Sequence, residues 1–256
     1  MTLDIDNSSS IFEEKIIESF SKYARSYDRY AILQRSMAER LASYLPETTP
    51  PHIIELGCGT GLFTRHLLTL PIENLILNDI SSAMIDILKD HLDLPSYTKF
   101  LIGNAENISM EKTDLICANA VFQWFQKPQS SLIHLKKSLN NKGTILFSTF
   151  GPETLKEFRQ AANMNSPITL YSINQWKKFI KKTGFTLKLF DCEKRKIFTP
   201  NTMNLIKNLQ QIGAAPIKIF DVGGLRKLIR YYDKHFATKQ GVYATWELYY
   251  FSISLE

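Results

Sequence analysis

The sequence predicts an α/β fold, with a seven-stranded, mostly parallel sheet and helices on both of its faces. Short apolar runs alternate with helix-like segments between residues 52 and 150, which is typical of a parallel sheet covered on both sides. The first apolar run ends in a turn with three glycines, Gly57, Gly59 and Gly61. An apolar content of 44% and a charged content of 22% are ordinary for a globular protein, so one domain with insertions is expected.

The region before the first strand predicts a helical lid. Apolar residues recur at helical spacing over Phe12–Tyr30, with an interruption near Ser26, and again over Ala31–Leu45. Three prolines between residues 46 and 51 end the second helix. We therefore expect residues 1–50 to form a lid and residues 51–256 to form the ligand-binding domain.

The remaining elements follow from the apolar runs and their turn residues. Strands are expected at 53–56, 75–79, 99–102, 115–118, 144–149, 185–198 and 241–254. Helices are expected at 62–70, 81–91, 130–139, 152–164, 172–183, 202–212 and 225–236, with Ser81 and Ser172 as N-caps. The segments near 150–170 and 200–238 interrupt the alternation. We expect them to be helical insertions that recognise the substrate, outside the carboxyl ends of the strands.

The glycine turn indicates a nucleoside site. Glycine lets the backbone approach a ligand closely because no Cβ intervenes. Asp79 ends the next strand, where a carboxylate accepts hydrogen bonds from a ribose. The spacing Gly-x-Gly-x-Gly differs from the Gly-x-Gly-x-x-Gly pattern of dinucleotide sites.

The segment E-L-G-C-G-T-G at residues 55–61 resembles the first motif of class I, Rossmann-like methyltransferases. That resemblance implies S-adenosylmethionine as the cofactor. It also implies that Asn104, after the third strand, accepts a hydrogen bond from the adenine amine through its carbonyl oxygen, and that Ile80 and Met84 flank the adenine.

Longer motifs narrow the resemblance to one family. The pattern F-x-x-x-A-x-x-Y-D-x-x-A-x-x-Q at residues 20–34 precedes the glycine turn, and N-A-V-F-Q-W at 119–124 and F-S-T-F-G-P-E-T-L-K-E at 147–157 follow it. With L-Q-Q-I-G-A at 209–214 and K-Q-G-V-Y at 239–243, they are similar to the malonyl-acyl carrier protein O-methyltransferases of biotin synthesis. The similarity covers almost the whole chain.

The resemblance implies methyl transfer from S-adenosylmethionine to the free carboxylate of a malonyl thioester on an acyl carrier protein. The expected cofactor-binding residues are Tyr23, Gln34, Glu55, Gly57, Cys58, Gly59, Gly61, Asp79, Ile80, Ser81, Met84, Asn104, Ala105, Glu106 and Asn119. The expected catalytic residues are Tyr27, Gln123, Trp124 and Arg35.

A carboxylate acceptor sets simple chemical demands. With a reference pKa of roughly 4 it is already ionised at neutral pH, so no general base is needed, and the five histidines occupy unrelated positions. It does need a cation, for which Arg35 and Arg159 are the candidates. Tyr27 is expected to direct its hydroxyl at the reaction centre.

Charge and cysteine content bound the partners. The net charge of +6, concentrated after residue 135, suits an acidic partner such as a carrier protein. Three dispersed cysteines indicate reduced thiols and no metal site. The polar segment Met1–Ser10 does not resemble a signal peptide. We expect a cytoplasmic monomer that binds neither membrane nor nucleic acid.

Three alternatives remain open at this point. A carboxyl methyltransferase for a small free acid, of the trans-aconitate type, shares the lid pattern. A non-catalytic protein that binds the cofactor as a scaffold shares the glycine turn. A nucleic-acid methyltransferase fits the pI of about 9.1, but the segment after the fourth strand lacks the Asn/Asp-Pro-Pro-aromatic motif that holds a nucleobase amine.

Overall fold

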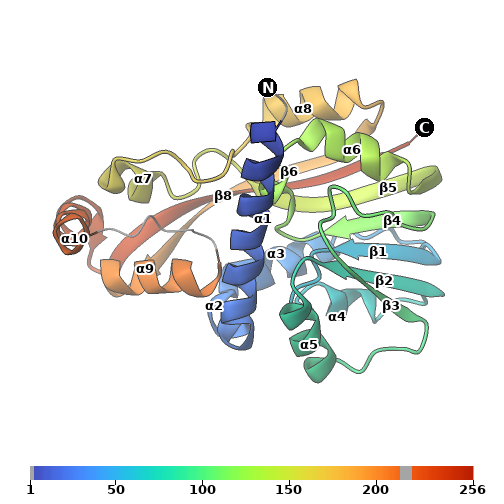
Figure 1. Cartoon of the computed structure of the whole chain (residues 1–256), viewed down its shortest axis with the longest axis horizontal. Helices are drawn as coiled ribbons and strands as arrows, with labels where there is room; N and C mark the ends of the chain where they lie inside the picture. The colour runs from blue at the N-terminus through green and yellow to red at the C-terminus, as the bar shows by residue number, and fades with distance from the viewer. Residues whose placement is uncertain (1–2, 214–220, 256) are drawn as a thin grey trace.

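The computed structural model describes residues 3–213 and 221–255, so Ala214 of the L-Q-Q-I-G-A motif lies outside the described residues. A mixed sheet in the order β3-β2-β1-β4-β5-β8-β6 forms the centre of the molecule (Figure 1). Its strands are β1 (His52–Leu56), β2 (Asn74–Asp79), β3 (Thr98–Ile102), β4 (Thr113–Ala118), β5 (Leu139–Phe150), β6 (Thr186–Thr199), β7 (Ala237–Thr238) and β8 (Gly241–Ser254). The predicted α/β fold is confirmed, with one strand more than the seven expected, because the two-residue β7 pairs with β8.

Strands β1 to β5 are parallel, and β8 lies antiparallel between β5 and β6. Successive side chains of a strand point to opposite faces. Ile53 and Leu115 therefore join one apolar core, while Ile54 and Ile116 join the other. These two cores make the sheet a rigid platform whose carboxyl edge carries the loops of the site.

Helices cover both faces of this platform. They are α1 (Leu3–Tyr23), the 3-10 turn η1 (Ala24–Ser26), α2 (Tyr27–Tyr30), α3 (Ile32–Ala42), α4 (Thr64–Leu67), α5 (Ser82–His91), η2 (Phe122–Trp124), α6 (Pro128–Lys136), α7 (Lys156–Ala162), α8 (Ile173–Lys182), α9 (Thr202–Gln211) and α10 (Val222–Phe236). Residues of α3, α4 and α5 bury their apolar sides in the first core, and residues of α6 and α8 in the second. The described helices include none that is long and apolar enough to cross a membrane.

The last two long strands continue beyond the platform. β8 pairs with β5 only between Leu248 and Ser254, but pairs with β6 from Val242 onward. The resulting two-stranded extension carries α7, α9 and α10, which lie together at the left of Figure 1. Phe158, Leu209 and Trp246 of this extension belong to the same apolar core as Ile53 and Leu115 of the sheet.

Several details differ from the sequence prediction. The interruption near Ser26 is confirmed as the turn η1, but the first helix extends back to Leu3. Ser172 caps α8 with a full capping box. Ser81 occupies the N-cap position of α5 without a side-chain cap bond, because its hydroxyl pairs with the Ser21 hydroxyl at 2.8 Å. The helix expected at 62–70 is a single turn, α4.

Candidate active site

The glycine turn adopts a conformation that side chains would obstruct. Gly57 and Gly59 have φ of +59° and +54°, in the left-handed region that favours glycine. A Cβ on Gly57 would come within 2.4 Å of a methyl group of Val121, whereas the space beside Gly59 is open. The backbone N–H of Cys58 donates to the Asn78 carbonyl at 2.8 Å, which fixes the turn to β2. The backbone at Gly59 is therefore accessible to a ligand.

Asp79 is the buried acid beside this turn. Its Oδ2 accepts from the Gly59 N–H and its Oδ1 from the Ser81 N–H, each at 2.8 Å. Burial raises the pKa of Asp79 to about 6, although the N–H groups of Ser81 and Gly59 oppose the shift. At neutral pH the carboxylate is ionised, and each oxygen keeps a lone pair for a hydroxyl donor.

A cavity of about 790 Å³, counting its open mouth, lies above this turn; we call it the glycine-loop cavity. The predicted residues that line it are Tyr27, Gly57, Gly59, Asp79, Ile80, Met84, Asn104, Ala105, Glu106, Asn119 and Trp124. Loops from β1, β2, β3 and β4 thus converge at one edge of the sheet, as expected for a nucleoside site at a switch in strand order.

Helix α1 crosses in front of the sheet in Figure 1, and its residues form one wall of this cavity. Phe12, Ile16 and Phe20 line the cavity from one face of the helix. Glu13 accepts a hydrogen bond from the Asn104 amide at 2.8 Å. The sequence predicted this helix as part of the lid and assigned Tyr23 on it to the cofactor, but it assigned no ligand role to Phe12, Glu13 or Ile16. The feature of the sequence that could have indicated this role is an apolar helix face with no obvious partner strand.

A smaller space of about 290 Å³, the inner cavity, continues beneath the turn between Gln34, Glu55 and Cys58. The Gln34 side chain is buried, and its Oε1 accepts no hydrogen bond from the described residues. Glu55 accepts from the Thr64 hydroxyl at 2.7 Å, and burial raises the pKa of Glu55 to about 8. A buried acceptor without a donor is costly, so Gln34 fits a ligand with an N–H or O–H group here.

A second large cavity, of about 870 Å³ with its mouth, lies between the platform and the extension; we call it the insertion cavity. Its walls are mainly apolar, and they include Phe150, Phe158, Leu209 and Trp246. Phe20, Tyr27, Ala120 and Trp124 line both large cavities. These four residues therefore separate a cofactor-sized space from a substrate-sized space.

Two aromatic contacts define this partition. The Phe20 ring packs edge-to-face on Tyr27 and on Trp124, with centroids 6.3 and 5.6 Å away. Burial raises the pKa of the Tyr27 phenol well above its ordinary value, and the negative charges of Asp79 and Asp28 add to the shift. The Tyr27 phenol therefore stays protonated at neutral pH, so it is able to donate a hydrogen bond but is not a base.

Arg159 lines the insertion cavity, and Arg35 does not. The Arg159 guanidinium donates to the backbone carbonyls of Thr154 and Pro152, which hold it in place. Burial lowers the pKa of Arg159, but a guanidinium remains charged at neutral pH. Among the described residues, these two carbonyls take up two of its five N–H groups, which leaves the others available to a ligand. Arg35 is exposed and donates to the Asp28 carbonyl at 3.1 Å.

Three predicted polar residues are engaged in internal hydrogen bonds. The Gln123 amide donates to the Ala120 carbonyl, and the Asn119 amide donates to the Gln34 carbonyl at 3.0 Å. The Glu106 carboxylate accepts from three donors at the start of α6, namely Gln126 N, Lys127 N and Ser131 Oγ. These contacts position the walls of both cavities.

Four predicted residues lie outside the cavities already described. Arg35 and Ser81 line none of them, and Tyr23 lines a separate groove between α1 and the end of α9. Gly61 has φ of +89°, and its missing Cβ makes room for Leu92. Gly61 therefore shapes the turn from behind, away from the ligand side.

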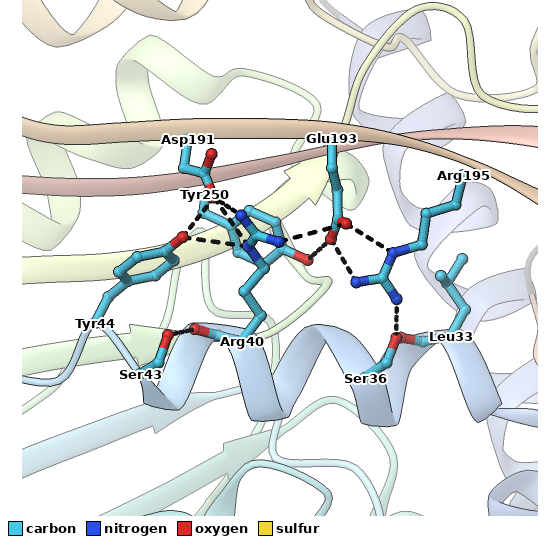
Figure 2. Close-up of polar contacts among 9 residues, drawn as sticks. All are labelled: Leu33, Ser36, Arg40, Ser43, Tyr44, Asp191, Glu193, Arg195 and Tyr250. Carbon is cyan, nitrogen blue, oxygen red and sulfur yellow. Dashed lines mark hydrogen bonds and ion pairs between the residues drawn. The ribbon is translucent and has the colours of Figure 1, made fainter.

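A polar network fastens α3 to the extended strands (Figure 2). Arg40 donates to Asp191 at 2.5 Å and reaches Glu193 at 3.5 Å. Glu193 also accepts from Arg195 at 2.7 Å and from the Tyr250 hydroxyl at 2.9 Å. Helix α3 is thus bound to the platform, and Gln34 on it has a fixed position.

Comparison with known proteins agrees with this geometry. Residues 27–188 match the family model of a methyltransferase domain. The fold is similar to that of a solved S-adenosylmethionine-dependent methyltransferase from Thermotoga maritima, described as a possible histamine N-methyltransferase (TM-score 0.55, 17% identity, 92% of this chain and 99% of that one). Fold and site together define a class I, S-adenosylmethionine-dependent methyltransferase.

Curated relatives narrow the class. The chain is 31% identical over 253 residues to the malonyl-[acyl-carrier protein] O-methyltransferase of Paenibacillus sp. (strain JDR-2), covering 88% of this chain and 92% of that protein. It is 32% identical over 225 residues to the protein of the same name from Bacteroides thetaiotaomicron, covering 86% and 82%. The chain therefore belongs to the family of malonyl-[acyl-carrier protein] O-methyltransferases.

Proposed function

We propose that this enzyme methylates the free carboxylate of a malonyl thioester carried on an acyl carrier protein, giving the methyl ester primer for biotin synthesis. The observation that supports this most directly is Arg159. It is the one arginine or lysine among the described residues that line the mainly apolar insertion cavity. A charged carboxylate in such a space needs a paired cation.

S-adenosylmethionine, when bound, supplies an electrophilic methyl group. The residues present fit it. Asp79 would accept hydrogen bonds from the ribose hydroxyls, and Ile80 and Met84 would provide apolar surface for the adenine. The space beside Gly59 is open, so the cofactor would be able to approach the backbone of the turn closely. The free Oε1 of Gln34 would accept from the amino group of the methionine part.

The protein's part in the reaction is alignment and exclusion of water. The carboxylate is already ionised, so it needs no base, and no histidine lines either large cavity in the described chain. Arg159 would hold the carboxylate at the boundary formed by Phe20, Tyr27 and Trp124. Holding the two reactants in line and removing solvent supply most of the acceleration in such a transfer.

Incubation with malonyl-carrier protein and methyl-labelled S-adenosylmethionine tests the proposal. A base-labile methyl ester is expected on malonyl-carrier protein and not on acetyl-carrier protein, which lacks the carboxylate. Ester formation on trans-aconitate but not on malonyl thioesters would favour the small-acid alternative. Cofactor binding with no ester on any acid would favour the scaffold alternative.

The pair of arginines supplies a matched test of the carboxylate site. Truncating one partner of a buried charge pair costs about 2 kcal/mol or more, so Arg159→Met should lower kcat/KM at least ~30-fold. Arg35→Met removes the same charge from an exposed position and should change kcat/KM less than about twofold, as is usual for a surface substitution. The reverse result would assign the carboxylate to Arg35.

A further inference from the structure

Helix α10 presents a basic face that no described residue neutralises. Val222, Arg226, Arg230 and Lys234 follow one another at four-residue steps, so they form one stripe along the helix. At 1.5 Å per residue the stripe is about 18 Å long. Arg226, Arg230 and Lys234 are exposed, and none of them forms an ion pair with a described residue. Lys227 adds a fourth exposed cation beside them.

The acidic residues at this helix, Asp221 and Asp233, both accept hydrogen bonds from the protein itself. Asp221 caps the helix by accepting from the Gly224 N–H. Asp233 accepts from the Thr202 hydroxyl at the start of α9. The outward face therefore combines positive charge with two exposed apolar groups, Val222 at 68% and Tyr231 at 36% exposure.

The inward side of α10, opposite the basic stripe, packs against the walls of the insertion cavity. Gln160, which follows Arg159 in α7, donates from its amide to the Tyr231 hydroxyl at 3.2 Å. The Phe158 ring, which lines the cavity, packs against Tyr232 of α10 with centroids 6.3 Å apart. Helix α10 also packs on α9, whose Leu209 lines the same cavity. Figure 1 shows α10 as the outermost helix of the extension.

We propose that the outward face of α10, formed by Val222, Arg226, Lys227, Arg230, Tyr231 and Lys234, is the docking surface for an acidic carrier protein whose tethered malonyl group enters the insertion cavity. The proposal rests on the proposed function, because it needs a substrate attached to a protein. Charge complementarity steers association, and the apolar groups supply the dry contact between the cations.

A second lysine-rich surface on the chain provides the control. Helix α8 exposes Lys178, Lys181 and Lys182, but it covers the opposite face of the platform together with α6. None of its residues lines either large cavity. Attraction of an acidic protein by net charge alone would make the two surfaces equivalent, whereas docking for delivery of the substrate distinguishes them.

The experiment compares two triple variants with equal change of charge, R226E/R230E/K234E on α10 and K178E/K181E/K182E on α8. Each is assayed on malonyl-carrier protein and on malonyl-pantetheine, which has the arm without the protein. Removing steering lowers association rates by about 10-fold or more. The α10 variant should therefore lose at least ~10-fold in kcat/KM on malonyl-carrier protein, with malonyl-pantetheine turnover unchanged. The kcat/KM of the wild-type enzyme on malonyl-carrier protein should depend on salt, and the α10 variant should lack this dependence.

The outcomes separate the two proposals. Absence of ester from wild-type enzyme on both substrates refutes the proposed function. Active wild-type enzyme with an unaffected α10 variant, or with an equal loss in the α8 variant, overturns the docking surface. If the α10 triple variant loses malonyl-pantetheine turnover as well, the neutral variant R226Q/R230Q decides. If this variant loses turnover selectively on malonyl-carrier protein, the result supports the docking surface. If its turnover falls by the same factor on both substrates, the result refutes it.

Discussion

Replacing Asp79 by Asn tests the cofactor site with the least change in shape. In the native protein each carboxylate oxygen accepts one backbone N–H, from Gly59 and from Ser81, at 2.8 Å. Asn keeps one acceptor and turns an NH₂ group toward the other N–H. The ribose hydroxyls also lose a charged acceptor in this variant. Losing a hydrogen bond to a charged group costs about 1.5–3 kcal/mol, so affinity for S-adenosylhomocysteine should fall about 10- to 150-fold.

Isothermal titration of the purified protein with S-adenosylhomocysteine measures this loss. Wild-type affinity should also weaken as the pH falls below about 6, because Asp79 then becomes protonated, and the Asn variant should lack that dependence. Asp86→Asn on the exposed side of α5 is the control and should bind normally. A folded Asp79→Asn protein with wild-type affinity would remove Asp79 from the site.

Three further predictions concern stability, each measured by denaturant unfolding of the ligand-free protein. The raised pKa of Glu55 means that its ionisation is unfavourable in the native state. The free energy of unfolding of the wild-type protein should therefore fall relative to Glu55→Gln as the pH rises from 4.5 to about 8, by about 1.4 kcal/mol per pH unit. Parallel pH curves for the two proteins would contradict this. Gly57→Ala should destabilise more than Gly59→Ala, because only the former collides with Val121; equal losses would show that the collision is relieved. Tyr250→Phe should cost about 1 kcal/mol by removing a hydrogen bond from the network in Figure 2, and an unchanged midpoint would exclude that contribution.

The sequence predicted those parts of the fold that depend on local pattern. Alternating apolar runs located the parallel strands, and the break at Ser26 and the cap at Ser172 were found from neighbouring residues alone. The placement of the glycine turn and Asp79 beside one cavity was predictable because it depends on backbone conformation and on position at a strand end. The strand β7 was not, since two residues pair only through the register of β8.

The substrate side of the site could not be predicted in the same way. Arg35 and Arg159 have the same chemistry, and only the packing of α7 against the extension brings one of them into a cavity. On the cofactor side, Glu106 lines the glycine-loop cavity, but the residue pattern did not indicate that its carboxylate also accepts hydrogen bonds from the start of α6. Such choices depend on contacts between segments far apart in the chain, which residue patterns do not encode.

The shared wall of Phe20 and Trp124 has a kinetic consequence. Both rings line both large cavities, and Phe20 belongs to α1, which covers the glycine-loop cavity. In contrast to α3, which the Arg40 network binds to the sheet, α1 has a hydroxyl contact at Ser21 and an amide contact at Glu13 with the rest of the platform. We expect that a movement of α1 away from the glycine-loop cavity would also withdraw Phe20 from the insertion cavity. Release of the two products would then depend on one motion, and we expect the enzyme to exchange both in each cycle rather than retain either through successive turnovers.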